Sequence, residues 1–311
     1  MKSSMQIFSG NANLPLAKKI CEYLNIPLGE AEVKRFPDGE IDVKVLEDVR
    51  GADVFVIQPT CPPVNDNLLE LLILVDCLKR ASADRITAVM PYFGYARQDR
   101  KAEGRVPITA KLVANMLTSS GANRALAMDL HAAQIQGFFD IPTDHLFAAP
   151  VMIEHFRKLE IANLVVVSPD VGGIKMARAY AKRLNAELAI LDKRRDTPTA
   201  TEVMHVIGDV QGKNVILVDD MISTASTVTE ASRAVKTNGA KDVYLCATHA
   251  VLCGNAVEKI NKSNLKKVVV TDTVPLDGKK VENLTTLSVA NILGEALKRI
   301  HKSESVSSLF V

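Results

Sequence analysis

Short runs of branched apolar residues recur along the chain, and segments with helical spacing of apolar and polar positions lie between many of them. Most of these runs are too short for a helix and do not alternate, which is typical of strands buried on both faces. The predicted strands lie at residues 53–57, 86–90, 124–128, 164–167, 215–218, 243–246 and 267–270. The predicted helices lie at residues 67–80, 108–119, 174–184 and 227–238. This alternation predicts an α/β protein with parallel sheets and right-handed crossovers.

A similar unit of helix and strand occurs in both halves of the chain. Residues 109–131 and 227–249 share a Thr, a Gly-Ala dipeptide and a His at one offset, because 227 − 109, 239 − 121 and 249 − 131 all equal 118. With 311 residues, the chain is also about twice a common domain size. We therefore predict two related α/β domains, over residues 1–150 and 151–311. The alternative is chance similarity between two units of one α/β class.

Composition and charge argue against several broad classes of function. Lys and Arg (38) nearly balance Asp and Glu (36), so nothing favours a nucleic-acid partner, and any anion site must be local. The longest apolar stretch, residues 68–78, is interrupted by Glu70 and Asp76 and is too short to span a membrane. The N-terminal stretch lacks the apolar core of a signal peptide. Five cysteines without a CxxC pair or zinc spacing suit reduced thiols, so we expect a cytoplasmic protein.

The residues after the predicted strand at 215–218 are unusually polar, and ligands of open α/β sheets bind at the carboxyl ends of strands. Asp219 and Asp220 precede a hydroxyl-rich turn that leads into a helix. The turn contains Ser223, Thr224, Ala225, Ser226 and Thr227. Carboxylates accept hydrogen bonds from ribose hydroxyls, while hydroxyls, loop N–H groups and a helix N-terminus hold phosphate. The pattern indicates a sugar phosphate site. In the structural alternative, Ser226 or Thr227 only caps the helix and the acids are solvated.

This VDD turn resembles the phosphoribosyl-binding motif of type I phosphoribosyltransferase folds. Further motifs make nearly the whole chain similar to the ribose-phosphate pyrophosphokinase family: RFPDGE (35–40), PYFGYARQDRK (91–101), DLHAAQIQGFF (129–139), VVVSPDVGG (165–173), DKRR (192–195) and VMHVIGDVQGK (203–213). The resemblance implies two type I phosphoribosyltransferase-like domains, each a largely parallel sheet flanked by helices. It also implies Mg²⁺-dependent transfer of the diphosphoryl group of ATP to the anomeric hydroxyl of ribose 5-phosphate, which yields 5-phosphoribosyl 1-diphosphate and AMP.

No Walker A sequence and no GxGxxG occurs, so other residues must hold the nucleotide. By resemblance, the ATP contacts are Phe36, Asp38, Gly39, Glu40, Arg97 and Gln98. The resemblance implies that the Phe36 ring stacks on adenine and that the acids accept hydrogen bonds from its amino edge or the ribose. It also implies that Arg97 pairs with phosphate. Without the resemblance, the residues of RFPDGE predict only a Pro-Asp-Gly hairpin turn.

The resemblance also implies which residues carry the reaction. Lys193 and Arg195 would lie at or in a mobile loop that closes on the transferring group, where they would neutralise negative charge. A solvated basic loop is the alternative. Asp219 and Asp220 would orient the ribose hydroxyls, and residues 223–227 would hold the 5-phosphate.

His131 and Asp170, each just after a predicted strand, resemble the metal-binding positions of the family. The implied metal is Mg²⁺, which prefers oxygen ligands, so most of its shell would be ATP and water. Because His249 takes the equivalent place in the second half, His131 has an alternative interpretation as a structural histidine at a strand end. We expect no metal role for His249.

The loop at residues 95–106 is rich in Arg and Lys. By resemblance, it takes part in contacts between subunits of a homo-oligomer, a hexamer in the family, with inorganic phosphate and ADP as effectors. A basic loop without apolar anchors is also typical of a disordered surface segment.

Two other functions stay open: a phosphoribosyltransferase that consumes the diphosphate sugar, and a non-catalytic regulatory paralogue. The motifs resembling an ATP site argue against the first, and the retained catalytic and metal positions argue against the second. The family loop commonly reads DDxxDTGGT, whereas here Ser223 replaces the later acid and Ala225-Ser226 replace the glycine pair. We predict that this loop still binds phosphate, through its hydroxyls and backbone N–H groups, with altered affinity.

Overall fold

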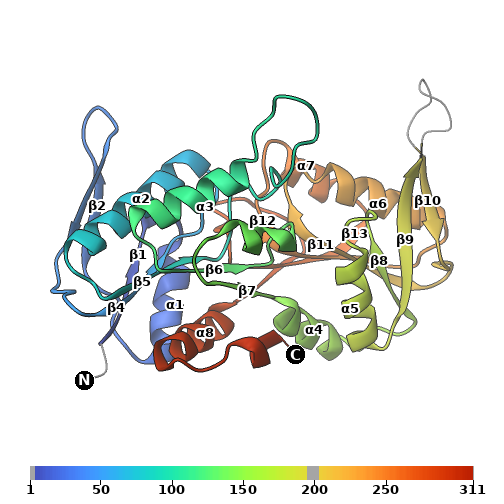
Figure 1. The fold of residues 1–311 in the computed structure, drawn as a ribbon. Coiled ribbons are helices and arrows are strands. Elements are labelled where there is room, and N and C mark those ends of the chain that lie inside the picture. The colour runs from blue at the N-terminus through green and yellow to red at the C-terminus, as the bar shows by residue number, and fades with distance from the viewer. Residues whose placement is uncertain (1–3, 195–202, 311) are drawn as a thin grey trace. The chain divides into compact units, whose positions relative to one another are not determined.

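Parallel strands form the centre of the first of two units (Figure 1). The structure, a computed structural model, describes residues 4–194 and 203–310. The order of the five strands in this sheet is β1 (Met5–Ser9), β4 (Asp53–Ile57), β5 (Arg85–Met90), β6 (Arg124–Met128) and β7 (Thr143–Leu146). The helices of the unit are α1 (Leu14–Leu24), α2 (Val64–Arg80), α3 (Thr109–Ser120) and α8 (Ala290–Lys302). In Figure 1, α2 and α3 lie on one face of the sheet, and α1 and α8 on the other.

Burial on both faces explains why the strand sequences are continuously apolar. Every residue of β4 is buried, because helices cover both sides of this central strand. Short 3₁₀ helices complete the unit: η1 (Asn11–Asn13), η2 (Ala133–Phe138) and η3 (Ser307–Phe310). A separate antiparallel hairpin consists of β2 (Ala31–Arg35) and β3 (Ile41–Val45), and it packs on α2.

The second unit contains a seven-stranded sheet in which all neighbours are parallel except β10 and β9. The strand order is β10 (Val203–Ile207), β9 (Glu187–Arg194), β8 (Leu164–Ser168), β11 (Asn214–Ile222), β12 (Val243–Ala250), β13 (Leu265–Thr271) and β14 (Leu284–Leu287). The helices are α4 (Ala149–Lys158), α5 (Ile174–Leu184), α6 (Ser226–Thr237) and α7 (Ala256–Asn261).

The two sheets share part of their strand arrangement. The last three parallel strands follow chain order in both, β5-β6-β7 in the first sheet and β11-β12-β13 in the second, whereas the two strands before them are β1-β4 in the first and β9-β8, in reversed chain order, in the second. In each unit a helix, α3 or α6, leads from a central strand to the next parallel strand. Gly121 (φ +120°) and Gly239 (φ +86°) follow these helices in the left-handed conformation, as the repeat predicted. The predicted α/β fold with two related halves is therefore confirmed.

The boundary between the units differs from the expected division at residue 150. The second unit begins at Ala148, and residues 273–275 and 288–311 belong to the first unit. The physical reason is that α8 packs against α1, where Tyr23 Oη donates a hydrogen bond to Glu295 at 3.1 Å. The C-terminal helix therefore completes the first half of the chain.

A buried charged cluster fixes α8 to the first sheet. The carboxylate of Asp53 in β4 accepts two hydrogen bonds from Arg85 in β5 (2.7 and 2.5 Å) and lies 2.8 Å from His301 Nδ1. Asp53 is 3% exposed. Its hydrogen bonds raise the pKa of Arg85, and Arg85 also donates to the Ile300 carbonyl at 3.0 Å. One carboxylate therefore connects two strands with the last helix.

No helix within residues 4–194 and 203–310 has both the length and the apolar character needed to cross a membrane.

Replacing Asp53 with Asn should destabilise the first unit, because Arg85 and His301 would lose the buried charge that they share. Removing one partner of a buried ion pair costs about 3–5 kcal/mol. Urea unfolding of the full chain, followed by circular dichroism, measures the loss. Asp76→Asn is the matched control, because it removes the partner of the exposed Arg80 and should change stability little. Equal unfolding midpoints for Asp53→Asn and the unsubstituted chain would contradict this role.

Candidate active site

Polar residues follow the carboxyl ends of the parallel strands in the first unit. Gly10 and Asn11 come after β1, Gln58 comes after β4, and Asp129 and His131 come after β6. Because these strands are parallel, their carboxyl ends lie along one edge of the sheet. The first unit thus has a polar edge of the kind that binds ligands in open α/β sheets.

The sequence RFPDGE forms the tip of the hairpin between β2 and β3. The Phe36 N–H donates to the Glu40 carbonyl (2.8 Å), and the Gly39 N–H donates to the Phe36 carbonyl (2.9 Å). Gly39 has φ +96°, which favours glycine, and the Asp38 carboxylate accepts from the Glu40 N–H at 3.1 Å. The hairpin turn predicted from these residues is confirmed. Its Phe36 side chain is 50% exposed and open to a planar ligand.

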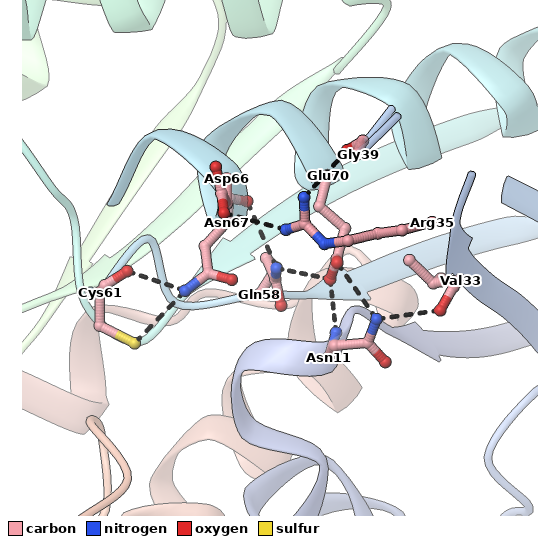
Figure 2. Close-up of polar contacts among 9 residues, drawn as sticks. All are labelled: Asn11, Val33, Arg35, Gly39, Gln58, Cys61, Asp66, Asn67 and Glu70. Atoms are coloured by element: carbon pink, nitrogen blue, oxygen red, sulfur yellow. Dashed lines mark hydrogen bonds and ion pairs between the residues drawn. The ribbon is translucent and has the colours of Figure 1, made fainter. Parts of the chain in front are cut away.

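A buried network of side chains lies beneath this hairpin (Figure 2). Its centre is Glu70 of α2, which is 5% exposed. The Glu70 carboxylate accepts hydrogen bonds from the Asn11 N–H (2.5 Å), the Asn11 side-chain amide (3.2 Å) and the Gln58 amide (2.8 Å). Gln58 in turn accepts from the Ala12 N–H at 3.1 Å. Several N–H donors thus stabilise one buried carboxylate.

The network reaches the hairpin through two side chains (Figure 2). Asn11 Nδ2 also donates to the Val33 carbonyl in β2 at 3.1 Å. The Arg35 guanidinium donates to the Gly39 carbonyl (3.1 Å) and to the carboxylate of Asp66 in α2 (3.0 Å). These contacts fix the hairpin relative to Asn11 and to α2.

Sequence reasoning noted Glu70 only as an interruption of an apolar stretch. A signal was available, because Glu70 lies one helical turn before Leu74, and a carboxylate on the apolar face of a helix needs partners if it is buried. Gly10 is a second unnoticed member of the site. A Cβ atom there would lie 2.4 Å from Gln58 Oε1, so the backbone approaches the network too closely for any side chain.

Arg97 and Gln98 lie in the long connection between β5 and α3. The Gln98 carbonyl accepts from the Ala110 N–H at 3.1 Å, and its side chain accepts from the Thr109 hydroxyl, so Gln98 caps the start of α3. The Arg97 side chain is exposed. Ala96 is buried and Tyr95 packs on the apolar core, so the expectation of a loop without apolar anchors is wrong.

The histidines of the two halves occupy different environments. His131 is exposed and lies beyond the end of β6, whereas His249 is 1% exposed and lies within β12. This difference argues against the alternative in which His131, like His249, is a structural histidine at a strand end. Sequence reasoning missed His145 of β7, which is buried and accepts the Leu130 N–H at its Nε2 atom (2.9 Å). His145 therefore holds the backbone next to His131.

In the second unit, charged residues lie at the carboxyl ends of three neighbouring strands. The central strand β8 is parallel to both β9 and β11, so the three ends share one edge. Asp170 follows β8, Lys193 lies near the end of β9, and Asp219 lies in β11. The backbone of Lys193 pairs with Met204 of β10. Arg195, the other predicted catalytic residue, lies outside the described residues.

Asp219 and Asp220 belong to β11, which continues to Ile222 instead of ending at residue 218 as expected. The reason is that Met221 and Ile222 continue the parallel pairing with β12. Burial raises the pKa of Asp219 well above its ordinary range, and the charges of Asp220 and Asp170 add to this effect. The structure thus brings these three predicted site residues together. A bound cation or hydroxyl donors would relieve the excess of negative charge.

The turn after β11 leaves the N-terminus of α6 without a side-chain cap. The cap position is Ala225, which has φ +60° and no side-chain acceptor, so the interpretation of Ser226 or Thr227 as the cap is wrong. The first N–H groups of α6 therefore have no side-chain partner from the cap and can bind an anion. The Thr224 and Ser226 hydroxyl oxygens lie 3.4 Å apart beside them.

Among the described residues, no group of three or more His, Cys, Asp or Glu side chains is arranged to hold a metal ion. The two predicted metal positions, His131 and Asp170, belong to different units. Asp170 uses one carboxylate oxygen, Oδ1, to accept from the Gly173 N–H at 2.9 Å. A metal role for either residue stays a prediction.

Comparisons with known proteins show what this chain is similar to. Residues 5–121 match the family described as the N-terminal domain of ribose phosphate pyrophosphokinase, and residues 193–311 match the phosphoribosyl synthetase-associated domain. The chain is 56% identical to the ribose-phosphate pyrophosphokinase of Synechococcus elongatus, over 98% of this chain and 93% of that protein. It is 55% identical to that of Nitrosomonas europaea, over 99% of this chain and 98% of the relative.

A solved structure gives the same result for the fold. The phosphoribosylpyrophosphate synthetase from Mycobacterium smegmatis is 39% identical, with a TM-score of 0.92, and the match covers 97% of this chain and 100% of that one.

Replacing Asp219 with Asn should raise the melting temperature of the ligand-free chain at neutral pH, because it removes a charge that its surroundings oppose. The folded-state pKa of Asp219 is raised, so its ionisation penalises the folded state only above the unfolded-state pKa. The increase in melting temperature should therefore be largest above the folded-state pKa of Asp219 and should shrink as the pH falls through that value. Thermal melting in a chelating buffer at several pH values measures the effect.

Asp242→Asn is the control, because the Lys266 ammonium (2.6 Å) lowers the pKa of Asp242 and its charge stabilises the fold. This substitution should lower the melting temperature or leave it unchanged. A lower melting temperature for Asp219→Asn at neutral pH would contradict the electrostatic description of the edge.

Proposed function

The chain belongs to the ribose-phosphate pyrophosphokinase family. We propose which of its residues bind each substrate and which act in catalysis. The protein is a ribose-phosphate diphosphokinase, which forms 5-phosphoribosyl 1-diphosphate for nucleotide biosynthesis. The anomeric oxygen of ribose 5-phosphate bonds to the β-phosphorus of ATP. The bond from that phosphorus to the bridging oxygen of the α-phosphate breaks, and AMP leaves. The anomeric hydroxyl loses its proton.

The observation that carries the proposal is the edge formed by β11 and α6 in the second unit. Two carboxylates precede an uncapped helix N-terminus that is lined by hydroxyl groups. We assign Asp219 and Asp220 to the ribose hydroxyls, which would donate hydrogen bonds to the carboxylates. Residues 223–227 bind the 5-phosphate through hydroxyls and backbone N–H groups. This division puts the anion at the helix N-terminus and the neutral hydroxyls at the acids.

ATP is assigned to the first unit. The exposed Phe36 ring stacks on adenine, while Asp38, Gly39 and Glu40 form the turn that presents this ring and accept hydrogen bonds from the nucleoside. Arg97, whose guanidinium is exposed, pairs with the phosphates. Gln98 contributes mainly by holding the loop on α3, since its side chain contacts Thr109.

Catalysis is assigned to Lys193 and Arg195, whose positive charges would stabilise the phosphoryl oxygens and the departing AMP. Phosphoryl transfer depends on positioning and electrostatic stabilisation more than on covalent chemistry. The backbone of Lys193 lies at the carboxyl edge of the sheet that also bears Asp170 and Asp219, which supports this assignment.

Mg²⁺ is the proposed cofactor, as the family resemblance implies. Asp170 supplies carboxylate oxygen, the ligand type that Mg²⁺ prefers, and one of its oxygens accepts from the Gly173 N–H. Asp170 and His131, which belong to different units, are each proposed as a residue that would hold Mg²⁺. Bound Mg²⁺ supplies neutralisation of the phosphate charge.

Assembly, regulation and location are proposed from the family resemblance. We infer a homo-oligomer, a hexamer as in the family, with inorganic phosphate and ADP as effectors. The five cysteines are all free thiols, which supports a location in the reducing cytoplasm. A regulatory paralogue is the second candidate function, because Ser223 and Ser226 replace family residues in the phosphate loop.

Replacing Arg97 with Ala should weaken ATP binding about tenfold or more, because a charge-assisted contact to phosphate is lost. Binding of ribose 5-phosphate alone should change little, since its proposed ligands lie in the second unit. Isothermal titration calorimetry of each substrate measures both effects. Arg80→Ala, which removes an exposed guanidinium paired with Asp76, should leave both affinities unchanged. Loss of ribose 5-phosphate affinity with normal ATP affinity would overturn the assignment.

Replacing Lys193 with Ala should lower kcat by roughly a hundredfold or more, while the affinity for ribose 5-phosphate stays within a few-fold. A contact made chiefly in the transition state affects turnover more than ground-state binding. Steady-state formation of AMP, together with calorimetry of ribose 5-phosphate, separates the two quantities. Lys182→Ala, on the exposed side of α5, serves as the control. Near-normal turnover of Lys193→Ala would remove it from the catalytic role.

A further inference from the structure

The phosphate loop of this chain contacts a cation that no motif predicted. Lys259 of α7 donates a hydrogen bond from Nζ to Ser226 Oγ at 2.7 Å. Ser226 is the first residue of α6 and one of the two positions at which this loop departs from the family pattern by gaining a hydroxyl. The ammonium of Lys259 therefore lies at the helix N-terminus to which the 5-phosphate is assigned.

The charge of Lys259 is not neutralised by an acid. In the part of the chain that the structure describes, no carboxylate forms an ion pair with Lys259, and Ser226 Oγ is the hydrogen-bond acceptor of its Nζ. Neighbouring lysines differ, because Lys262 pairs with Glu258 (2.6 Å) and Lys266 pairs with Asp242 (2.6 Å). An ammonium group has three N–H donors, so two remain for another acceptor.

Backbone hydrogen bonds before α7 and the apolar packing of α7 fix the position of Lys259. The Cys253 N–H donates to the Ser223 carbonyl (2.8 Å), and the Leu252 N–H donates to the Ile222 carbonyl (2.9 Å), which ties the connection before α7 to the phosphate loop. Ala256 and Ile260, on either side of Lys259 along α7, are buried in the apolar core. Lys259 itself is only partly buried. The helix therefore cannot move away from the loop without breaking backbone hydrogen bonds and apolar packing.

Charge favours an anion at this point. Ser223 removes a negative charge that the family loop commonly carries, and Lys259 adds a positive one beside the first turn of α6. The absence of an acid at residue 223 and the positive charge of Lys259 both strengthen the attraction for phosphate, in addition to the helix dipole. The hydroxyl of Ser226 takes one N–H of the ammonium and so orients it.

We propose that Lys259 is a ligand of the 5-phosphate of ribose 5-phosphate, with its ammonium oriented by Ser226. This inference rests on the function proposed above and adds to it a binding residue on a different helix. In this chain, a pair formed by a serine and a lysine would compensate for the glycine that the loop lacks.

The test compares binding of ribose 5-phosphate to the full chain and to Lys259→Met, which keeps the apolar stem but removes the charge. We expect Lys259→Met to bind ribose 5-phosphate about tenfold more weakly and to bind ATP normally, because one charge-assisted contact is lost. The salt dependence of the affinity should also fall. Lys259→Arg, which keeps the charge, should restore most of the affinity.

Lys262→Met is the matched control, because Lys262 lies one turn further along and pairs with Glu258. It should bind ribose 5-phosphate like the unsubstituted chain. If Lys259 only supported the loop mechanically, Lys259→Met would lower the melting temperature and leave the affinity and its salt dependence unchanged. That result would overturn the proposal.

The Ser226→Gly variant separates direct contact between Lys259 and the phosphate from an effect of Lys259 that acts through the Ser226 hydroxyl. In Ser226→Gly, which restores the family residue, a direct phosphate ligand still matters, so adding Lys259→Met should again weaken binding severalfold. No further loss in that background would overturn direct contact.

The failure of this inference differs from the failure of the proposed function. If the unsubstituted chain forms AMP and the diphosphate sugar while Lys259→Met binds ribose 5-phosphate equally well, only the role of Lys259 fails. If the unsubstituted chain neither binds ribose 5-phosphate nor forms product, while Ser226→Gly gains synthesis, the function proposed for the native loop fails.

Discussion

Parallel strand pairing is the constraint on which the rest of the structure depends. Parallel neighbours require a crossover between strands, and several of these crossovers contain helices that cover the sheets, such as α2, α3 and α6. The same pairing puts the carboxyl ends of β9, β8 and β11 on one edge. Residues as distant in the sequence as Asp170 and Asp219 are therefore brought close enough for their charges to interact. The first sheet does the same for Asn11 and Gln58, which meet at Glu70.

The two edges differ in how well their polar groups are satisfied. In the first unit, Glu70 receives hydrogen bonds from Asn11 and Gln58, so a buried carboxylate becomes a rigid support for the hairpin. In the second unit, burial and the charges of Asp220 and Asp170 disfavour the ionised form of Asp219, and the first turn of α6 has no side-chain cap. This edge therefore has a destabilised carboxylate and a helix N-terminus whose first N–H groups have no side-chain partner from the cap position. We interpret the network at the first edge as a support for the hairpin to which ATP is assigned, and the second edge as the place proposed for ribose 5-phosphate.

Much of the fold could be predicted because its signals are local. The helix at residues 174–184 was predicted with both ends correct, since Asn185 can adopt the left-handed cap and the apolar spacing is regular. The turn at Gly39 followed from Pro-Asp-Gly. The place of α8 could not be predicted, because its partner α1 lies far away in the sequence. Glu70, His145 and Lys259 belong to no motif, and only tertiary contacts reveal their partners. The predicted roles of Phe36, Lys193 and the other site residues came from family resemblance, not from spacing.

The most direct measurement is the pair of products that the full chain forms from ATP, ribose 5-phosphate and Mg²⁺, followed by phosphorus NMR. Transfer of a diphosphoryl group predicts AMP and a diphosphate on C1 of the sugar in equal amounts, with no ADP. ADP together with a single phosphate on C1 would contradict attack at the β-phosphorus. Folded protein that consumes neither substrate would contradict the assignment of this chain as an enzyme and favour the regulatory paralogue.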